Sequence, residues 1–417
     1  MIPILFKFEF NSPGAQAFLY LVALGLVAYI ALSGWRGAQG PLNPKTKEFD
    51  PPDAQQRWQR AGMFGAGALV LAYVGLHYAL PPTVPFFNGK GEGIPIHTYG
   101  VLLASGFILA ATLLGHLALQ EWRGEEGLRK RDQLMDMTFW ILVGGIVGSR
   151  VLFIIVNWKD YVQDTLSGTL SKVFDLGGGL VFYGGLIGAS IAALAFARKH
   201  DINFAQLADL CLPTVSLGQC LGRLGCFSAG CCWGDVARPD MKFGVHFPGA
   251  MAKNLFGQIG GAPSLAFQSQ QTDPRWVVEE TGKLFHNAVP NAVQMSTWVN
   301  EHGHTLPVHP TQLYESAGQF CLMILFLFLR RYRRFHGQIA GMWLMSYAVL
   351  RSTVELFRGD LERGTLHGLV NQVPAEAWYN ISTSQFISLC MFTGGAVILY
   401  RGAQKVMAAS TGALATA

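Results

Sequence analysis

Nine apolar segments of this chain are each long enough to cross the hydrocarbon core of a membrane, which is about 30 Å thick and takes roughly twenty helical residues. This feature restricts the fold most, because a backbone in lipid must satisfy its own hydrogen bonds as a helix or a closed barrel. Only 14% of the residues are charged, against about 25% in soluble domains. The segments lie near residues 15–35, 61–80, 97–119, 136–158, 177–197, 204–226, 314–330, 338–357 and 383–400.

The basic residues of the connecting loops predict the orientation of these segments. One set of alternate loops carries seventeen Lys and Arg, whereas the short loops of the other set carry five. Because basic loops remain in the cytoplasm, we expect the N-terminus outside and the C-terminus in the cytoplasm. The fold prediction is an all-α polytopic integral membrane protein with about nine transmembrane helices. The net charge of +5 is modest and does not indicate a nucleic-acid partner.

The long connection from about 227 to 313 is predicted to face outward. Its stretch "GGAPSLAFQSQQTDP" (260–274) has the composition of a loop. Its stretch "TGKLFHNAVPNAVQMSTWVNEH" (281–302) is predicted to hold one short helix.

Ionisable residues occur within the predicted spans, where charges are costly and usually functional, and five of them form one group. The predicted topology places all five in the outer half of the membrane. Three arginines against two carboxylates leave a surplus of positive charge, and the abundant anion at that depth is a lipid phosphate. Arginine suits phosphate because its planar guanidinium donates two parallel hydrogen bonds. The five are Arg150, Arg223, Arg351, Glu315 and Glu355.

A structural alternative stays open for the arginines. Arg351 and Glu355 are four residues apart, so they could form an ion pair on one helix. Arg223 could extend its charged end to the interface.

A glycine-rich stretch, "DLGGGLVFYGGLIGAS" (175–190), supports a cleft at the same depth. Gly184 and Gly188 have the four-residue spacing that allows close helix contact, so tight packing alone is the alternative for them. Tyr183 should lie at the depth of the arginines. Its alternative is the belt of tyrosines found at membrane interfaces.

Cys226, Cys231 and Cys232 lie close together in "GRLGCFSAGCCWGD" (222–235), after the apolar run that contains Arg223. Their spacing is not that of a zinc finger, and no histidine stands beside them. Small buried thiols, a disulfide and a metal site are three alternatives, of which we expect the first. We predict no metal and no cofactor.

Several motifs resemble those of the prolipoprotein diacylglyceryl transferase family. "GRLGCFSAGCCWGD" resembles the family's arginine signature, "VFYGGLIGAS" (181–190) its second motif and "HPTQLYES" (309–316) its third. "GMWLMSYAVLRSTVELFRGD" (341–360) resembles the segment with its second arginine, here Arg351. "HTYGVLLASGF" (97–107) and "GGIVGSRVLF" (144–153) are weaker matches. The motifs cover roughly residues 95–402 in the expected order.

The resemblance implies transfer of the diacylglyceryl group of phosphatidylglycerol to the lipobox cysteine thiol of preprolipoproteins, with release of glycerol phosphate. It implies a bacterial cytoplasmic (inner) membrane protein with its cleft toward the outer leaflet, and we expect a monomer. Arg223, Arg351 and Tyr183 are the expected catalytic residues. The expected substrate-binding residues are Tyr99, Arg150, Gly184, Gly185, Cys226, Gly234, His309, Gln312, Tyr314, Glu315, Tyr347 and Glu355.

The resemblance also divides the chain. Residues 1–94 form an N-terminal extension with two extra spans, and 95–402 a seven-span transferase-like domain. That domain contains an insert at about 240–306, and residues 403–417 are a cytoplasmic tail.

Two departures from the family pattern bear on the chemistry. The family has His where this chain has Tyr183, which removes the simplest general base for a thiol of pKa ~8.5. It has Asn and Glu where this chain has Cys226 and Cys231. The alternative functions are an anion or lipid transporter that uses the intramembrane arginines, and a non-catalytic member of the family.

Overall fold

The structure of the 417-residue chain is a computed structural model. One compact unit comprises Tyr99–Met251 and Ala262–Ala417, and the other Ile2–Thr98 with Ala252–Gly261. The residues described are 4–8, 23–25, 27–28, 31–32, 53–59, 61–62, 65–66, 69, 94–161, 179, 181–238, 241–249, 263–278, 281, 283–285, 287–358 and 382–415.

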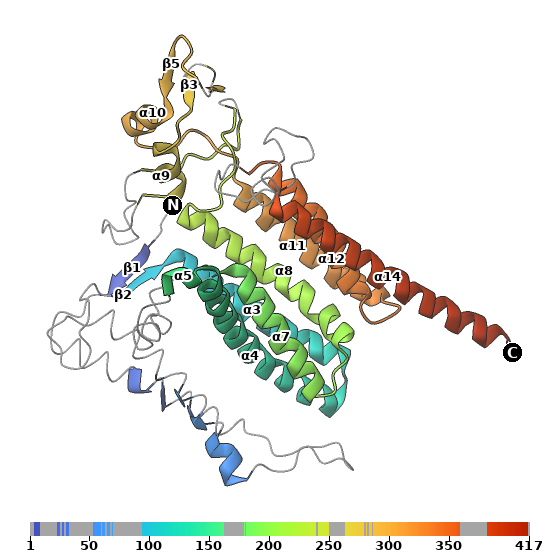
Figure 1. Ribbon diagram of the computed structural model, residues 1–417. Helices are drawn as coiled ribbons and strands as arrows, with labels where there is room; N and C mark the ends of the chain where they lie inside the picture. The colour runs from blue at the N-terminus through green and yellow to red at the C-terminus, as the bar shows by residue number, and fades with distance from the viewer. Residues whose placement is uncertain are drawn as a thin grey trace. The chain divides into compact units, whose positions relative to one another are not determined.

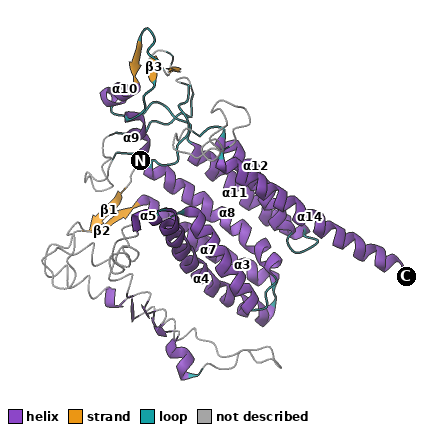
Figure 2. Ribbon diagram, in the orientation of Figure 1, coloured by secondary structure: helices purple, strands orange, loops and turns teal. Residues whose placement is uncertain are grey.

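Seven long helices make up most of the described part of the larger unit (Figures 1 and 2). Each overlaps one of the last seven predicted segments, but α4 begins 12 residues before its segment and α14 ends 15 residues after its segment. The first two predicted segments, 15–35 and 61–80, lie largely outside the described residues. The helices are α3 Thr98–Glu121, α4 Gly124–Val156, α7 Phe182–Lys199, α8 Phe204–Ala229, α11 Thr311–Leu329, α12 Gln338–Glu355 and α14 Thr383–Ala415.

The chain is an all-α membrane protein in its overall organisation. Among the described residues, four helical segments have the length and hydropathy needed to cross a membrane: Thr98–Glu121, Gly124–Val156, Thr311–Tyr332 and Thr383–Ala408. The helices α7 and α12 have only 18 residues each, and α8 contains Asp209, Gln219 and Arg223.

The helices have an inside-out distribution of polarity. Large apolar side chains such as Ile108, Ile146 and Leu389 are more than half exposed, as expected for surfaces that face lipid. Polar side chains are buried instead at the contact of α8 with α11, where Gln312 and Gln319 are fully buried. The contact of α8 with α11 therefore has a polar interior, although the outer surfaces of the helices are apolar.

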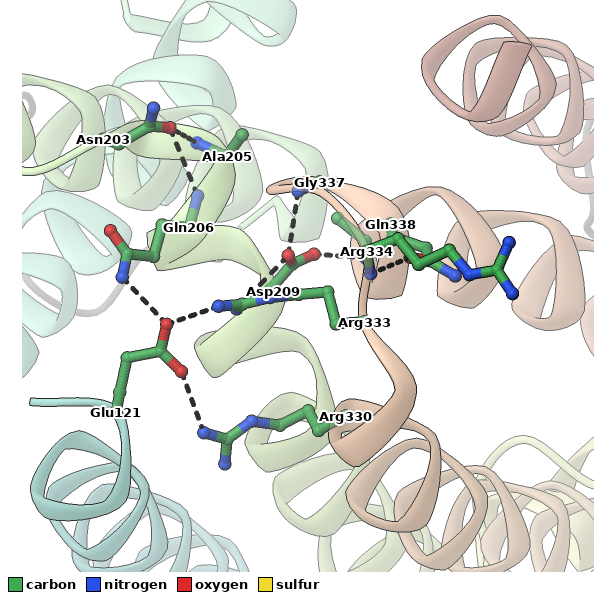
Figure 3. A network of polar contacts seen from close by, with 11 residues as sticks. Glu121, Asn203, Ala205, Gln206, Asp209, Arg330, Arg333, Arg334, Gly337 and Gln338 are labelled. Carbon is green, nitrogen blue, oxygen red and sulfur yellow. Dashed lines mark hydrogen bonds and ion pairs between the residues drawn. The ribbon is translucent and has the colours of Figure 1, made fainter. Parts of the chain in front are cut away.

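A polar network connects the start of α8 with the α11–α12 link (Figure 3). The buried carboxylate of Asp209 accepts hydrogen bonds from the backbone N–H groups of Gly337 and Ala340, both at 2.8 Å. These N–H groups belong to the first turn of α12, where backbone N–H groups have no acceptor within their own helix. Glu121 at the end of α3 forms ion pairs with Arg330 and Arg333.

The segment between α8 and α11 folds into a small compact structure. It contains α9 Leu265–Gln271, α10 Met295–His302 and an antiparallel sheet in the order β4–β3–β5. The strands are β3 Trp276–Val278, β4 Lys283–Phe285 and β5 Ala292–Gln294. The helix α10 confirms the short helix predicted within 281–302.

The prediction of a loop over 260–274 was wrong, because α9 forms there. Ser264 accepts a hydrogen bond from the Phe267 backbone N–H and so caps the helix. Phe267 is buried against Val277 and Met295. Burial against residues later in the chain thus outweighs the loop-like composition.

In the smaller unit, β1 Ile4–Phe8 pairs antiparallel with β2 Ile94–His97. These two strands depart from the predicted all-helical character, as does the three-stranded sheet. Both are short additions to a helical fold.

Candidate functional site

Arg223 and Glu315 form an ion pair between α8 and α11, with 2.9 Å between Arg223 Nη2 and Glu315 Oε1. Glu315 is 1% exposed. Within the described residues its other oxygen, Oε2, has no hydrogen-bond partner. Glu315 therefore pairs with one of the arginines, and one carboxylate oxygen is left to accept another hydrogen bond.

Arg351 lies on α12 and forms an ion pair with Glu355 one turn later, as in the structural alternative, at 2.8 Å between Nη1 and Oε2. Its Nη2 donates to the Ser384 hydroxyl of α14 at 3.0 Å. The side chain is 8% exposed. A guanidinium carries five N–H donors, so these two contacts leave Arg351 with donors for a ligand.

Tyr347 connects the two ion pairs. It lies on α12 and interacts electrostatically with Glu315, Arg351, Arg223 and Tyr183. Its ring stacks on Trp343 with 5.0 Å between centroids. Tyr347 is thus in electrostatic range of residues on α7, α8 and α11, and we call Arg223, Glu315, Tyr347 and Arg351 the arginine cluster.

Tyr183 lies at the start of α7 and is 42% exposed. Its ring packs edge-on against Phe182 at 5.9 Å. It is thus an accessible phenol that interacts electrostatically with Tyr347 of the arginine cluster.

Gly184 and Gly185, the next residues, face α4. A Cβ on Gly184 would collide with the Gly148 carbonyl oxygen, and one on Gly185 would lie 2.5 Å from the Ser149 hydroxyl. Gly184 is required for the close approach of α4 and α7, because its Cβ would meet backbone, whereas the Ser149 hydroxyl could rotate away from a Cβ on Gly185. The structure thus gives Gly184 the packing role that the sequence analysis left open for Gly184 and Gly188.

A cavity of about 460 Å³ follows this contact of α4 and α7. It is lined by apolar side chains and glycines. The residues lining it are Gly144, Val147, Gly148, Val151, Leu152, Ile155, Gly184, Ile187, Gly188, Ile191 and Ala192.

Arg150 lies near the end of α4, and its guanidinium packs over the rings of Phe153 and Tyr161 at 5.6 and 5.5 Å. Its Nη1 donates to the Gly179 carbonyl at 3.4 Å. These contacts hold α4 to α5 (Trp158–Tyr161). The guanidinium of Arg150 therefore lies next to two aromatic rings.

The "HPTQLYES" motif positions the chain that follows α8. Gln312 donates to the Cys231 carbonyl at 2.7 Å. The His309 ring contacts Tyr314 and Phe357, with 6.3 and 5.2 Å between centroids. The motif therefore connects the start of α11 to the end of α12.

Gly234 passes between two backbone segments. Its N–H donates to the His309 carbonyl at 2.9 Å. An added Cβ would lie 2.5 Å from that oxygen and from the Phe357 carbonyl oxygen. Only glycine fits this gap without displacing backbone.

The structure brings Cys226, Cys231 and Cys232 together, which their spacing did not predict. All three are free thiols and partly buried, and their sulfurs lie within 4.8 Å of one another. We call them the thiol cluster. Hydrogen bonds from Cys226 and Cys231, with the guanidinium groups of Arg358 and Arg223, lower the pKa of the Cys232 thiol below its usual range.

Tyr99 connects the thiol cluster with α3. Its ring lies against Gly225, where an added Cβ would be 3.0 Å from Tyr99 Cδ2. Tyr99 interacts electrostatically with Arg223 and with all three cysteines. Arg223, a member of the arginine cluster, also interacts electrostatically with Cys226 and Cys232 of the thiol cluster.

Comparison with known proteins agrees with the motifs. Residues 90–401 match the family model described as prolipoprotein diacylglyceryl transferase. Phosphatidylglycerol–prolipoprotein diacylglyceryl transferase 2 of Clostridium perfringens is 30% identical over 313 residues, which is 75% of this chain and 93% of that protein. The corresponding transferases of Clostridium tetani and Ralstonia pickettii are each 29% identical, over 71% and 73% of this chain and 89% of each protein.

Proposed function

We propose that this chain, which belongs to the prolipoprotein diacylglyceryl transferase family, transfers the diacylglyceryl group of phosphatidylglycerol to the lipobox cysteine thiol of preprolipoproteins and releases glycerol phosphate. The observation that carries the proposal is the arginine cluster, in which two arginines from different helices, each paired with a carboxylate, lie in electrostatic range of Tyr347. The acceptor sulfur attacks a glyceryl carbon while a phosphate leaves. An enzyme for this reaction must therefore hold the phosphate with fixed donors.

In this proposal, Arg223 and Arg351 bind the lipid phosphate. Glu315 and Glu355 each orient one guanidinium, and the remaining N–H groups face the ligand. The second oxygen of Glu315, Oε2, is a suitable acceptor for a hydroxyl of the glycerol headgroup. Tyr347 and Tyr183 are then placed to donate hydrogen bonds to phosphate or ester oxygens.

The remaining expected residues shape the site in this proposal. Tyr99 supports the end of α8, and Gly234 allows the backbone to pass between α11 and α12. His309, Gln312 and Tyr314 hold the mouth of the site.

We further propose that the chain is a monomer in a bacterial inner membrane and has nine spans, with the arginine cluster toward the outer leaflet. The bias of Lys and Arg among the loops supports this orientation. The polar network of Figure 3 then lies at the cytoplasmic end. Asp209 and Arg223 are fourteen residues apart on α8, or about 21 Å at 1.5 Å per residue, which places them near opposite faces.

A transporter of anions or lipids is the main alternative. Its charges should line a path through both halves of the membrane. Asp209 instead accepts hydrogen bonds from the first turn of α12. Glu121 forms ion pairs with Arg330 and Arg333. These contacts favour a structural role for that end and a single reactive end at the arginine cluster.

Exchange of each arginine for lysine tests the proposal. Lysine keeps the charge but loses the planar fork of donors. Arg223→Lys and Arg351→Lys should therefore each reduce transfer to a lipobox peptide about 100- to 1,000-fold, the range for loss of one oxyanion donor. Arg401→Lys, at an exposed position of α14, is the matched control and should transfer normally. Wild-type turnover in both site variants would exclude phosphate binding by these residues.

A further inference from the structure

We infer that the thiol cluster binds one Zn²⁺ ion through Cys226, Cys231 and Cys232, and that the fourth position of the ion takes the thiol of the acceptor cysteine. The second part rests on the proposed function. The inference departs from the expectation of no metal, because the sequence did not show that the three sulfurs lie together.

The geometry of the sulfurs suits a zinc ion. A Zn–S bond is about 2.3 Å, so sulfurs in a tetrahedral site are about 3.8 Å apart. The three sulfurs here lie within 4.8 Å of one another and need to close by at most about 1 Å. Thiolates are soft ligands that select zinc and copper(I) over the hard cations.

The backbone that carries the thiols is held from several directions. Gly230 ends α8 in the left-handed conformation with φ 68°, and Cys232 has φ 61°. A residue other than glycine is uncommon in this conformation and persists where its surroundings fix it. The fixing contacts are on the Cys232 carbonyl, which accepts hydrogen bonds from Thr311 Oγ1 and Arg358 Nη1, each at 2.9 Å.

These contacts arrange the ligands before any ion binds. The Gln312 side chain holds the Cys231 carbonyl in the same way, at 2.7 Å. The two cysteines of the turn thus keep a defined position relative to Cys226 on α8. A preorganised set of ligands loses little entropy when it binds.

The surrounding charges also fit. Three thiolates and one Zn²⁺ carry a net charge of −1. Arg223 and Arg358 are the cations that interact electrostatically with Cys232. They would compensate a partly buried anionic complex, which is costly to bury alone.

Three protein ligands leave one position open, as in catalytic zinc sites. A thiol that binds a zinc ion is deprotonated, which the reaction requires because the thiolate is the nucleophile. Arg223 interacts with Cys226 and Cys232 and pairs with Glu315 in the arginine cluster. The activated sulfur would therefore lie next to the phosphate site.

The step balances without another reactant. The acceptor thiol releases its proton to water when its sulfur binds the ion. The sulfur electron pair forms the C–S bond to the glyceryl carbon. The C–O bond to the phosphate breaks with its electron pair going to oxygen, and glycerol phosphate leaves as a phosphate monoester. This route assigns the activation of the acceptor thiol to the zinc ion, in a chain that has Tyr183 in place of the family's histidine.

The first test measures zinc in the full-length protein, purified in detergent with a tag that lacks histidine. Wild type should hold about one zinc per chain. Cys231→Ser and Cys232→Ser should hold about a tenth of that or less. Cys321→Ser changes an exposed cysteine of α11 and should keep the zinc. Equal zinc in all four proteins, no zinc in wild type, or a disulfide within the cluster by mass spectrometry would each overturn the site.

The second test replaces zinc by Co²⁺, whose thiolate complexes absorb in the near ultraviolet. A lipobox peptide with cysteine should change this absorption, whereas the same peptide with serine should not. An unchanged spectrum with the cysteine peptide would overturn binding at the fourth position.

The transfer assay separates the two proposals. Full transfer by metal-free protein would refute the inference and leave the proposed function standing. A zinc-loaded protein that binds the peptide thiol but transfers nothing would refute the proposed function and leave the metal site standing.

Discussion

Exchange of Glu315 for glutamine removes one negative charge from the arginine cluster while keeping the shape of the side chain. Glu315 is 1% exposed and pairs with Arg223 at 2.9 Å. The amide still accepts a hydrogen bond from Arg223. The variant therefore isolates the effect of the charge.

The expected loss in the free energy of unfolding of Glu315→Gln lies between two limits. Hydrogen bonds to charged groups contribute about 1.5–3 kcal/mol and neutral ones about 1 kcal/mol, so the smaller limit is about 1 kcal/mol. Breaking a fully buried pair costs about 3–5 kcal/mol. The Arg223 side chain keeps 22% of its exposure, and water screens part of its charge. We expect the free energy of unfolding to fall by about 1–3 kcal/mol.

Transfer should fall by about 10- to 100-fold, because each 1.36 kcal/mol of lost transition-state stabilisation is tenfold in rate. The assays are thermal unfolding in detergent and mass-detected transfer to a lipobox peptide. Glu121→Gln is the matched control, since Glu121 pairs with Arg330 and Arg333 at the other end of the bundle. It should lower stability and leave transfer near the wild-type rate.

Two results would refute this reasoning. A Glu315→Gln protein with wild-type stability and transfer would show that the charge of Glu315 contributes to neither. An equal loss of transfer in Glu121→Gln would show that activity follows stability alone.

Three further substitutions test other features by the same assays. Tyr183→Phe should reduce transfer by less than about a hundredfold, the loss of one hydrogen bond; a loss beyond about a thousandfold would instead identify the phenol as the general base. Gly234→Ala should lower stability by about 1–3 kcal/mol, because its Cβ would meet the His309 and Phe357 carbonyls at 2.5 Å; an unchanged melting temperature would contradict the close contact. Asp209→Ala should lower stability by about 1–3 kcal/mol, as two buried N–H groups lose their acceptor; Asp132→Ala, at an exposed position, is its control, and equal stability of the two would contradict the cap.

The helices were largely predictable because their signal is local. A membrane helix is indicated by about twenty consecutive apolar residues. For example, α11 Thr311–Leu329 begins three residues before the predicted segment 314–330. The pairing of Glu315 was predictable too, since a buried carboxylate at the depth of arginines needs a cation. Both inferences depend on removal from water, which the hydropathy and charge of the sequence indicate directly.

The thiol cluster was not predictable, since it depends on contacts made far along the chain. Cys231 is held by Gln312 and Cys232 by Thr311 and Arg358, residues about 80 to 126 positions later. The left-handed turn at Gly230 and Cys232 then returns the chain toward Cys226. Spacing alone gave no sign of this return.

The cap that Asp209 places on α12 has a consequence for biosynthesis. Asp209 leaves the ribosome 128 residues before Gly337, so α8 is made long before the N–H groups that its carboxylate serves. A carboxylate without partners is costly in lipid, and α8 must keep that end in water or among other helices until the hairpin of α11 and α12 arrives. The later hairpin thus completes the insertion of the earlier helix, and a nascent chain that stops before residue 337 should leave α8 accessible to water-borne labels.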